Sequence, residues 1–233
     1  MFEDDPIGYA IHDYLKGGVS QNIIVHSDLS EDDILPSSYL FRSEEEMPQI
    51  EQLALKSAEG KVLDVGAAAG AHSTLLTKRG FDVTAIDTSP YAVKHLNNIG
   101  IDAEQIDILD LTDKKYDTIF LLMNGIGIAG KISYLTDFLV HCASLLSENG
   151  KIICDSTDVR YFFEDNEGAF WVDLNTDYYG EFKFKMKYKE VETPWFNWLY
   201  ADFETLEKHC LEAGLKIKLL KEDAHAFLVE IKK

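Results

Sequence analysis

The sequence predicts an α/β fold built on a doubly wound sheet of seven strands, mostly parallel, and two observations lead to this class. Between residues 61 and 153, short apolar runs alternate with amphipathic segments, a pattern typical of a parallel sheet with helices on both faces. The chain closes with two apolar runs, 215–220 and 225–231. Because only a few residues join these two runs, we expect an antiparallel C-terminal pair.

The first strand of this repeat covers residues 61–65 and leads into small residues from Gly66 to Gly70. Glycine and alanine keep the backbone accessible, so a ligand can approach it closely. A dinucleotide-binding G-x-G-x-x-G turn would place glycine at position 68, where this chain has Ala68. Asp64 would repel a pyrophosphate and instead suits an ammonium group.

Three further strands end in acidic or small residues. They cover residues 81–87, 103–108 and 116–123, and the residues at their ends are Asp87 and Thr88, Asp107 and Ile108, and Asn124 and Gly125. The carboxyl ends of parallel strands meet at one edge of a sheet, where ligands bind in open α/β folds. Asp87 is placed to accept both hydroxyls of a ribose. Acids are common in this chain, so surface charge is the alternative interpretation of Asp87 and Asp107.

The pattern Asp64-x-Gly66-x-x-x-Gly70, followed by acids after the next two strands, resembles the class I S-adenosylmethionine-dependent methyltransferases, whose fold is Rossmann-like. The resemblance implies S-adenosylmethionine as the cofactor. It implies that the cofactor is bound by Asp64, Gly66, Ala67, Ala68, Gly70, Asp87, Thr88, Asp107, Ile108, Asn124 and Gly125. Among these, Asp87 would hold the ribose, and Asp107 and Ile108 the adenine. The resemblance covers residues 60–158 through motifs and 201–233 through architecture, and it departs from the family at Ala68.

Arg42 precedes the glycine turn by about twenty residues. Methyltransferases often bring an N-terminal arginine onto the carboxylate of the cofactor, a task that suits the fixed N–H donors of a guanidinium. The alternative is a surface salt bridge to Glu44, Glu45 or Glu46, and the sequence does not decide between the two.

Methyl transfer is an in-line displacement that needs positioning and a dry site, and it needs a base only if the acceptor arrives protonated. The candidates for a catalytic group are Asn124, His72 and Asp155. His72 is also explained as a histidine at a helix start that bonds to the backbone. Asn124 lacks the prolines and the aromatic residue that follow it in methyltransferases acting on nucleic-acid bases, so that acceptor class is disfavoured.

The chain divides into a helical N-terminal lid over residues 1–60 and a methyltransferase domain over 61–233, with an antiparallel hairpin inserted at about 159–200. Helices are expected over 7–15, 43–58, 72–79, 89–98, 132–146 and 202–213. The hairpin segment is rich in aromatic residues: Trp171, Tyr178, Tyr179, Trp195 and Trp198. These rings either form a substrate wall or a cage for a cation, or pack on the sheet or in a dimer contact.

Composition narrows the range of partners. Forty-one acids against 22 bases give a formal net charge of −19, which opposes a nucleic-acid partner. From its pattern we expect neither a membrane span nor a signal segment. Its three cysteines form neither a metal motif nor a disulfide framework, so we expect a cytoplasmic protein without a metal.

We therefore predict a methyltransferase that acts on a small molecule, as a monomer or homodimer. Two alternatives remain. A nicotinamide-dependent oxidoreductase would share the sheet, and a module that binds the cofactor without turnover would share every cofactor residue.

Overall fold

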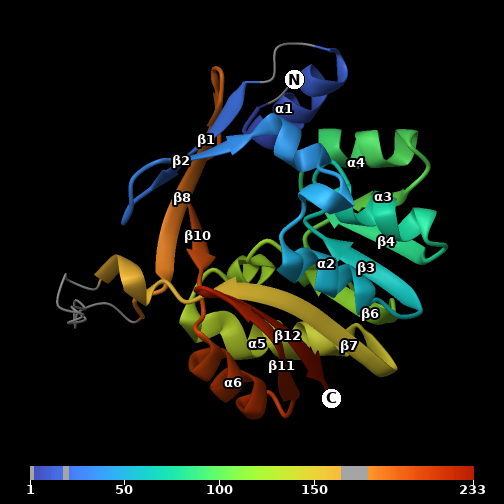
Figure 1. Ribbon diagram of the computed structural model, residues 1–233, viewed down its shortest axis with the longest axis vertical. Helices are drawn as coiled ribbons and strands as arrows, with labels where there is room; N and C mark the ends of the chain where they lie inside the picture. Colours follow the sequence, from blue (N-terminus) through green and yellow to red (C-terminus); the bar gives the residue numbers. More distant parts are fainter. Residues whose placement is uncertain (1–2, 18–20, 164–177) are drawn as a thin grey trace.

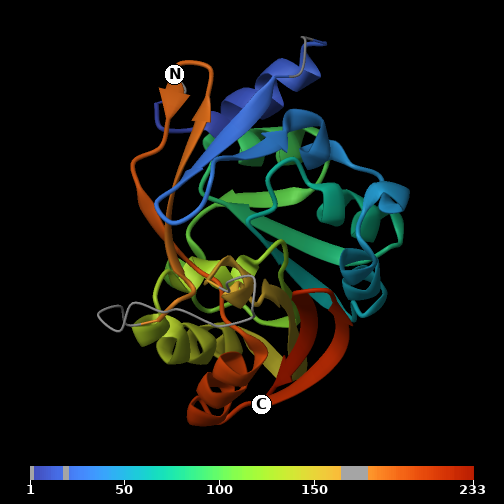
Figure 2. The same ribbon diagram turned by 60° about the vertical axis from the view of Figure 1, so that its left-hand side comes forward.

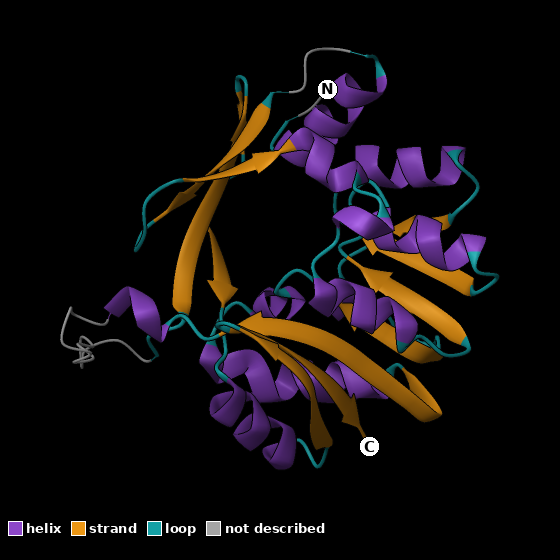
Figure 3. Cartoon of the chain, in the orientation of Figure 1, coloured by secondary structure: helices purple, strands orange, loops and turns teal. Residues whose placement is uncertain are grey.

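The structure is a computed structural model that describes residues 3–17, 21–163 and 178–233. Two sheets organise these residues: a large one flanked by helices and a small one that stands apart from it (Figures 1 and 3). No helix among the described residues is long and apolar enough to cross a membrane.

The large sheet has seven strands in the order β11-β12-β7-β6-β3-β4-β5. Its strands are β3 (Lys61–Val65), β4 (Asp82–Asp87), β5 (Asp102–Gln105), β6 (Tyr116–Leu121), β7 (Leu146–Thr157), β11 (Lys216–Asp223) and β12 (Ala226–Lys232). Strands β3 to β7 pair in parallel, whereas β12 runs antiparallel to both β7 and β11. This arrangement confirms the predicted doubly wound sheet with its antiparallel C-terminal pair.

Helices cover both faces of this sheet because neighbouring strand residues point to opposite sides. Val62 packs in a core with α2 (Gln49–Lys56) and α3 (Ala71–Lys78). Leu63 packs in the opposite core with α5 (Ile132–Ser144) and α6 (Phe203–Glu212). Helix α4 (Pro90–Asn98) begins at Ser89, whose side chain caps it by accepting from Ala92 N. These helices confirm the ranges predicted over 72–79, 89–98, 132–146 and 202–213 to within a few residues.

The small sheet corrects the prediction that residues 1–60 are purely helical. This segment contains α1 (Pro6–Leu15), but also β1 (Asn22–Ser27) and β2 (Asp33–Pro36). Strand β1 pairs with β8 (Glu181–Tyr188), more than 150 residues later, and β8 pairs with β9 (Val191–Glu192) and β10 (Phe196–Leu199). Figure 2 shows the blue and orange strands side by side. The predicted antiparallel hairpin is therefore present, as part of a larger sheet.

The helix predicted over residues 43–58 is divided by a proline. Ser43 and Glu46 form the expected capping box, but it opens only a short turn, Glu44–Glu46. Pro48 then lies immediately before α2. A proline has no N–H and its ring excludes a continuous helix through this position, so only the second half of the range is α-helical.

Candidate functional site

A cavity of about 880 Å³ opens at the carboxyl edge of the large sheet and reaches the small sheet. Its lining comes from the loops after β3, β4, β5 and β6, from the start of α1, and from β8 and β10 with the loop between them. The predicted cofactor residues that line it are Arg42, Asp64, Gly66, Ala67, Ala68, Asp87, Thr88, Asp107, Ile108 and Gly125. The structure thus brings together side chains that the sequence separates by more than eighty residues.

The turn after β3 uses left-handed backbone at three positions: Gly66 (φ 70°), Ala68 (φ 47°) and Gly70 (φ 81°). A Cβ atom added at Gly66 would meet no atom within 4 Å, so this glycine leaves open space beside the cavity. One added at Gly70 would lie 2.4 Å from the buried Leu96 Cδ2. Gly70 therefore serves packing and the start of α3, whereas Gly66 keeps the backbone accessible. Ala68 adopts a conformation that costs an L-residue about 1–2 kcal/mol.

Asp87 ends β4 and is half-buried at the cavity. Its Oδ2 accepts from Ala68 N and its Oδ1 from Ser89 N, each at 2.8 Å. Removal from bulk water raises the pKa of Asp87 to about 6, and the charges of Asp5 and Asp64 add to this, although the two backbone N–H bonds oppose it. Additional hydrogen-bond donors, such as the hydroxyls of a ribose, stabilise the ionised form of a carboxyl group whose pKa is raised in this way.

Asp107 and Ile108 lie beyond the end of β5 on the same cavity. Asp107 opens a short helical turn by accepting from Leu109 N at 2.9 Å. Ile108 is buried, and its carbonyl oxygen lies 2.7 Å from His141 Nε2. This arrangement presents an exposed carboxylate beside an apolar side chain, a pair suited to the amine edge and the face of a purine.

Asp64 is almost fully buried at the end of β3 and accepts from Ser73 Oγ at 2.5 Å. Its position among the cavity-lining residues fits the predicted role toward an ammonium group.

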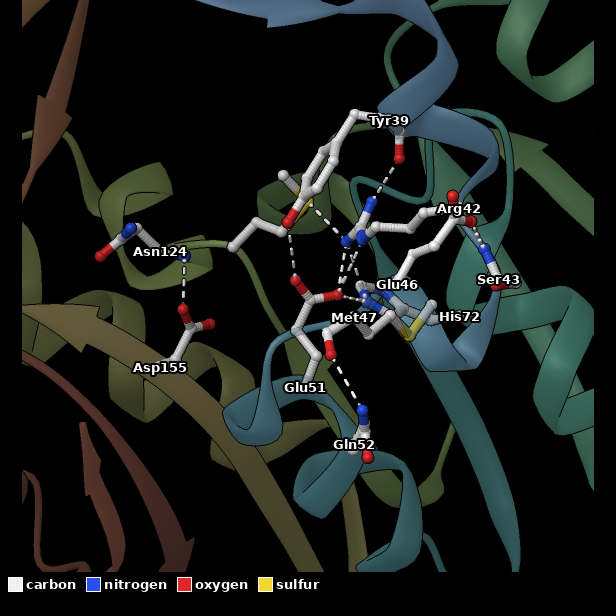
Figure 4. Close-up of polar contacts among 11 residues, drawn as sticks. Tyr39, Arg42, Ser43, Glu46, Met47, Glu51, Gln52, His72, Asn124 and Asp155 are labelled. Atoms are coloured by element: carbon white, nitrogen blue, oxygen red, sulfur yellow. Dashed lines mark hydrogen bonds and ion pairs between the residues drawn. The ribbon is translucent and has the colours of Figure 1, made fainter.

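Arg42 is also buried, with 5% of its surface exposed, which excludes the surface pairing with Glu44, Glu45 or Glu46. Its Nε and Nη2 donate to Glu51 Oε2 at 3.1 and 2.5 Å, and its Nη1 donates to the carbonyl oxygen of Tyr39 at 2.8 Å (Figure 4). Glu44 instead pairs with Arg79. The cation is therefore held rigidly at the wall of the cavity.

His72 lies in the same cluster, and its Nε2 is 2.7 Å from Glu51 Oε2 and 3.3 Å from Arg42 Nη2. The structure thus gives His72 side-chain partners in place of the expected backbone bond. Burial alone would raise the pKa of Glu51, but the hydrogen bonds and charges of His72 and Arg42 outweigh it and lower the pKa. Glu51, the buried partner of Arg42 and His72, is the residue of this cluster that the sequence interpretation missed. The sequence does contain a sign of this residue, because Glu51 is a charged position on the apolar face of α2, beside Ile50, Ala54 and Leu55.

Asn124 and Asp155 lie next to the cavity-lining residues but not among them. Asp155 Oδ2 accepts from Asn124 N at 3.0 Å (Figure 4), while Asp155 Oδ1 and Asn124 Oδ1 are closed off from solvent and have no partner among the described residues. Burial raises the pKa of Asp155 to about 6. Neither side chain therefore presents itself to the cavity as a free base.

The aromatic residues of the hairpin divide by role. Trp198 lines the cavity, together with Phe196 and Met186, which the sequence interpretation did not single out. The hydroxyls of Tyr178 and Tyr179 donate to Asp202 at 2.5 and 2.8 Å, so these rings pack beside α6. Trp195 is half-exposed and faces the ammonium of Lys185. Trp171 lies outside the described residues.

Comparison with known proteins agrees with this geometry. The family model for a methyltransferase domain matches residues 40–228. The structure of an S-adenosylmethionine-dependent methyltransferase from Bacteroides fragilis in complex with S-adenosyl-L-homocysteine is 38% identical, with a TM-score of 0.92 over 100% of this chain and 96% of that one. No curated protein matches the sequence.

Two less similar structures share the fold. The DhpI–SAM–HEP complex is 15% identical, with a TM-score of 0.60 over 79% of this chain and 84% of that one. DesVI from Streptomyces venezuelae is 14% identical, with a TM-score of 0.56 over 84% and 95%.

The matched domain, the fold and the relative bound to S-adenosyl-L-homocysteine exclude the oxidoreductase alternative and establish S-adenosylmethionine as the cofactor. The chain belongs to the class I S-adenosylmethionine-dependent methyltransferases.

Proposed function

We propose that this methyltransferase modifies a small molecule held between the cofactor and the small sheet. The observation that carries the proposal is the continuity of one cavity from the loops after β3, β4 and β5 to Met186, Phe196 and Trp198. The first group of loops accommodates the nucleoside, and the apolar wall opposite accommodates the acceptor. A concave cavity of this size fits a small ligand better than an extended polymer.

We further assign the cofactor contacts. Asp87 would hold the ribose hydroxyls, and Asp107 with Ile108 the adenine. Asp64 would face the ammonium group of the cofactor. Gly66, Ala67 and Ala68 leave the backbone open to it, with Thr88 and Gly125 at its flanks.

Arg42 would meet the cofactor carboxylate. A guanidinium has five N–H donors. Of the two hydrogens on Nη1, the carbonyl oxygen of Tyr39 takes one, which leaves the other for an incoming oxygen. The ion pair with Glu51 fixes the orientation of this donor.

Charge within the cavity favours a neutral or cationic acceptor. The described acids that line it are Glu3, Asp4, Asp5, Asp64, Asp87 and Asp107. Arg42 is the single lysine or arginine among the described lining residues, and Glu51 already neutralises it. Once Arg42 meets the carboxylate of the cofactor, a phosphate or carboxylate acceptor would find no further lysine or arginine among the described lining residues, which also opposes a nucleic acid.

The bound sulfonium supplies an activated methyl group, which leaves sulfur for an acceptor lone pair aligned with the breaking bond. This chain contributes the alignment and the exclusion of water. We expect the protein to act in the cytoplasm as a monomer or homodimer, which light scattering would distinguish.

The experiment is a labelling assay. Protein is incubated with S-adenosylmethionine that carries an isotopically labelled methyl group, once with a low-mass metabolite extract and once with protein and nucleic-acid fractions. We expect enzyme-dependent label in the low-mass extract alone. Label in either macromolecular fraction, with none in the extract, would refute a small-molecule acceptor. Asp87→Ala, which removes the acceptor for the ribose hydroxyls, serves as the variant with impaired cofactor binding.

A further inference from the structure

The turn that follows β6 contains two consecutive strained residues. Met123 and Asn124 adopt left-handed backbone with φ values of 60° and 56°. Side chains other than glycine rarely occupy this region, and two such residues in succession persist only where the surroundings hold them.

Two contacts hold this turn, one on each strained residue. Arg42 Nη2 lies 3.1 Å from Met123 Sδ, and Asp155 Oδ2 accepts from Asn124 N at 3.0 Å. Strands β6 and β7 pair in parallel, with Leu121 opposite Cys154. The residues that follow these two in each strand are therefore neighbours, which brings Asp155 to the turn after β6. A buried carboxylate thus accepts from a backbone N–H that lies beyond the end of β6, outside the hydrogen-bond ladder of the sheet.

The surroundings of the second carboxylate oxygen, Asp155 Oδ1, argue against a role for this residue as a base. This atom is closed off from solvent and has no partner among the described residues, and the side chain is only 7% exposed. A proton-accepting base must reach its substrate directly or through one water. Among the described residues, the hydrogen bond that the Asp155 side chain accepts is the one from the turn, at Asn124 N.

The turn itself shapes both parts of the cavity. Leu122, Met123 and Gly125 line it. Two residues later, a Cβ added at Gly127 would lie 2.2 Å from Trp198 Nε1, so the chain here lies directly against the acceptor wall. A displacement of this turn would therefore move the boundary between cofactor and acceptor.

We propose that Asp155 is a positioning residue, whose carboxylate holds the left-handed turn at Met123 and Asn124 in the conformation that receives the amino-acid end of the cofactor. The inference rests on the proposed function, because it takes this part of the cavity as the site of the amino-acid end.

The test is calorimetric titration of the full chain with S-adenosylhomocysteine. Loss of one charge-assisted hydrogen bond predicts that Asp155→Ala weakens binding about tenfold. Asp155→Asn retains an oxygen that can accept from Asn124 N, so its loss should be clearly smaller. Equal affinity of wild type and Asp155→Ala would overturn the inference, whereas absence of binding to the wild type would instead overturn the cofactor assignment.

A second variant separates positioning from a general loss of structure. Glycine adopts left-handed backbone without strain. In an Asn124→Gly background, Asp155→Ala should therefore weaken binding by much less than in the wild type. An undiminished loss in that background would show that Asp155 acts in some other way.

Asp117→Ala is the matched control. Asp117 also accepts from a backbone N–H, that of Lys61 at 2.8 Å, but it lies at the opposite end of β6. Its removal should leave the affinity for S-adenosylhomocysteine within about twofold, since hydrogen bonds distant from the ligand act on stability. A loss equal to that of Asp155→Ala would mark the effect as structural and overturn the inference.

Hydrogen exchange tests the same contact without any substitution. The amide of Asn124 should exchange slowly in the unmodified protein because Asp155 accepts from it. Exchange as fast as that of an exposed loop amide would contradict the contact, and so would overturn the proposal even if the Asp155 variants fail to fold.

Discussion

The carboxylate of Asp87 accepts from the backbone N–H of Ala68 at 2.8 Å, so the end of β4 fastens the turn that follows β3. The same carboxylate accepts from Ser89 N at the start of α4. One side chain thereby joins two neighbouring loops of the proposed cofactor site, and it stays half-buried at the cavity.

Substitution of Asp87 should abolish useful cofactor binding without unfolding the protein. Asp87→Ala removes the acceptor for two ribose hydroxyls, and two charge-assisted hydrogen bonds correspond to roughly 100-fold or more in affinity. Calorimetry with S-adenosylhomocysteine measures the loss, and circular dichroism verifies the fold. Asp82→Ala, at the exposed opposite end of β4, is the control and should bind like the wild type. Undiminished affinity in Asp87→Ala would refute the ribose assignment.

Cofactor binding should release protons near pH 6. The pKa of Asp87 is raised from 3.8 to about 6 in the free protein, and ribose hydroxyls together with a cationic ligand favour the ionised form. Binding therefore lowers this pKa, so the affinity falls as the pH drops below about 6 and levels off well above it. Titrations in two buffers of different ionisation enthalpy measure the proton count. Proton uptake at pH 6, or tighter binding at pH 5 than at pH 8, would contradict this account.

Two glycines of the turn after β3 should respond differently to alanine. Gly70→Ala places a methyl group against buried Leu96 in left-handed backbone, so we expect a loss of about 2–4 kcal/mol in the free energy of unfolding. Gly66→Ala meets no neighbour and should cost only about 1–2 kcal/mol in stability. Its methyl group adjoins the cavity, so cofactor affinity should fall more than stability. Denaturant unfolding and calorimetry on the same samples separate the two effects, and equal stability losses would contradict the assigned roles.

Breaking the buried pair of Arg42 and Glu51 should be strongly destabilising. Arg42→Met leaves the buried Glu51 carboxylate with His72 and the hydroxyl of Tyr39 as partners but without its cation, and removal of one partner from a buried pair costs about 3–5 kcal/mol. Urea unfolding measures the loss. The double variant Arg42→Met/Glu51→Leu should recover part of it, because the uncompensated charge is gone. A single variant as stable as the wild type would show that the pair contributes nothing.

The Glu51 pair also predicts a pH dependence of stability. The pKa of Glu51 is lowered in the folded protein from 4.5, so its contribution is present above pH 4.5 and is lost as the pH falls through the folded value. Glu51→Gln should therefore flatten the decline in stability below pH 4.5. A decline as steep as that of the wild type would assign acid unfolding to other carboxyl groups.

The large sheet could be predicted from the sequence because its signals are local. Apolar runs of strand length, the helix starts and the glycine turn all lie within short windows, and the parallel order places Asp64, Asp87 and Asp107 at one edge. Their shared cavity follows from that topology. Pro48 is also a local signal. It explains why the single helix predicted from the capping box at Ser43 is divided into a short turn and α2.

The small sheet and the Arg42 cluster could not be predicted in the same way. More than 150 residues, including strands β3 to β7, separate β1 from its partner β8, and no short stretch of sequence indicates such a pairing. Arg42 pairs with Glu51 and not with its neighbours Glu44–Glu46, because the fold of the connecting segment, and not proximity in sequence, decides which carboxylate is buried beside it. The acceptor wall at Phe196 and Trp198 depends on the same long-range pairing.

A crystal structure of the protein with S-adenosylhomocysteine tests the central claim most directly. The account predicts that the ribose hydroxyls bond to Asp87, the adenine amine to Asp107 and the carboxylate to Arg42, with the sulfur facing Met186, Phe196 and Trp198. A nucleoside bound outside the cavity at the carboxyl edge of β3 and β4, or with Asp87 and Asp107 out of contact, would contradict it.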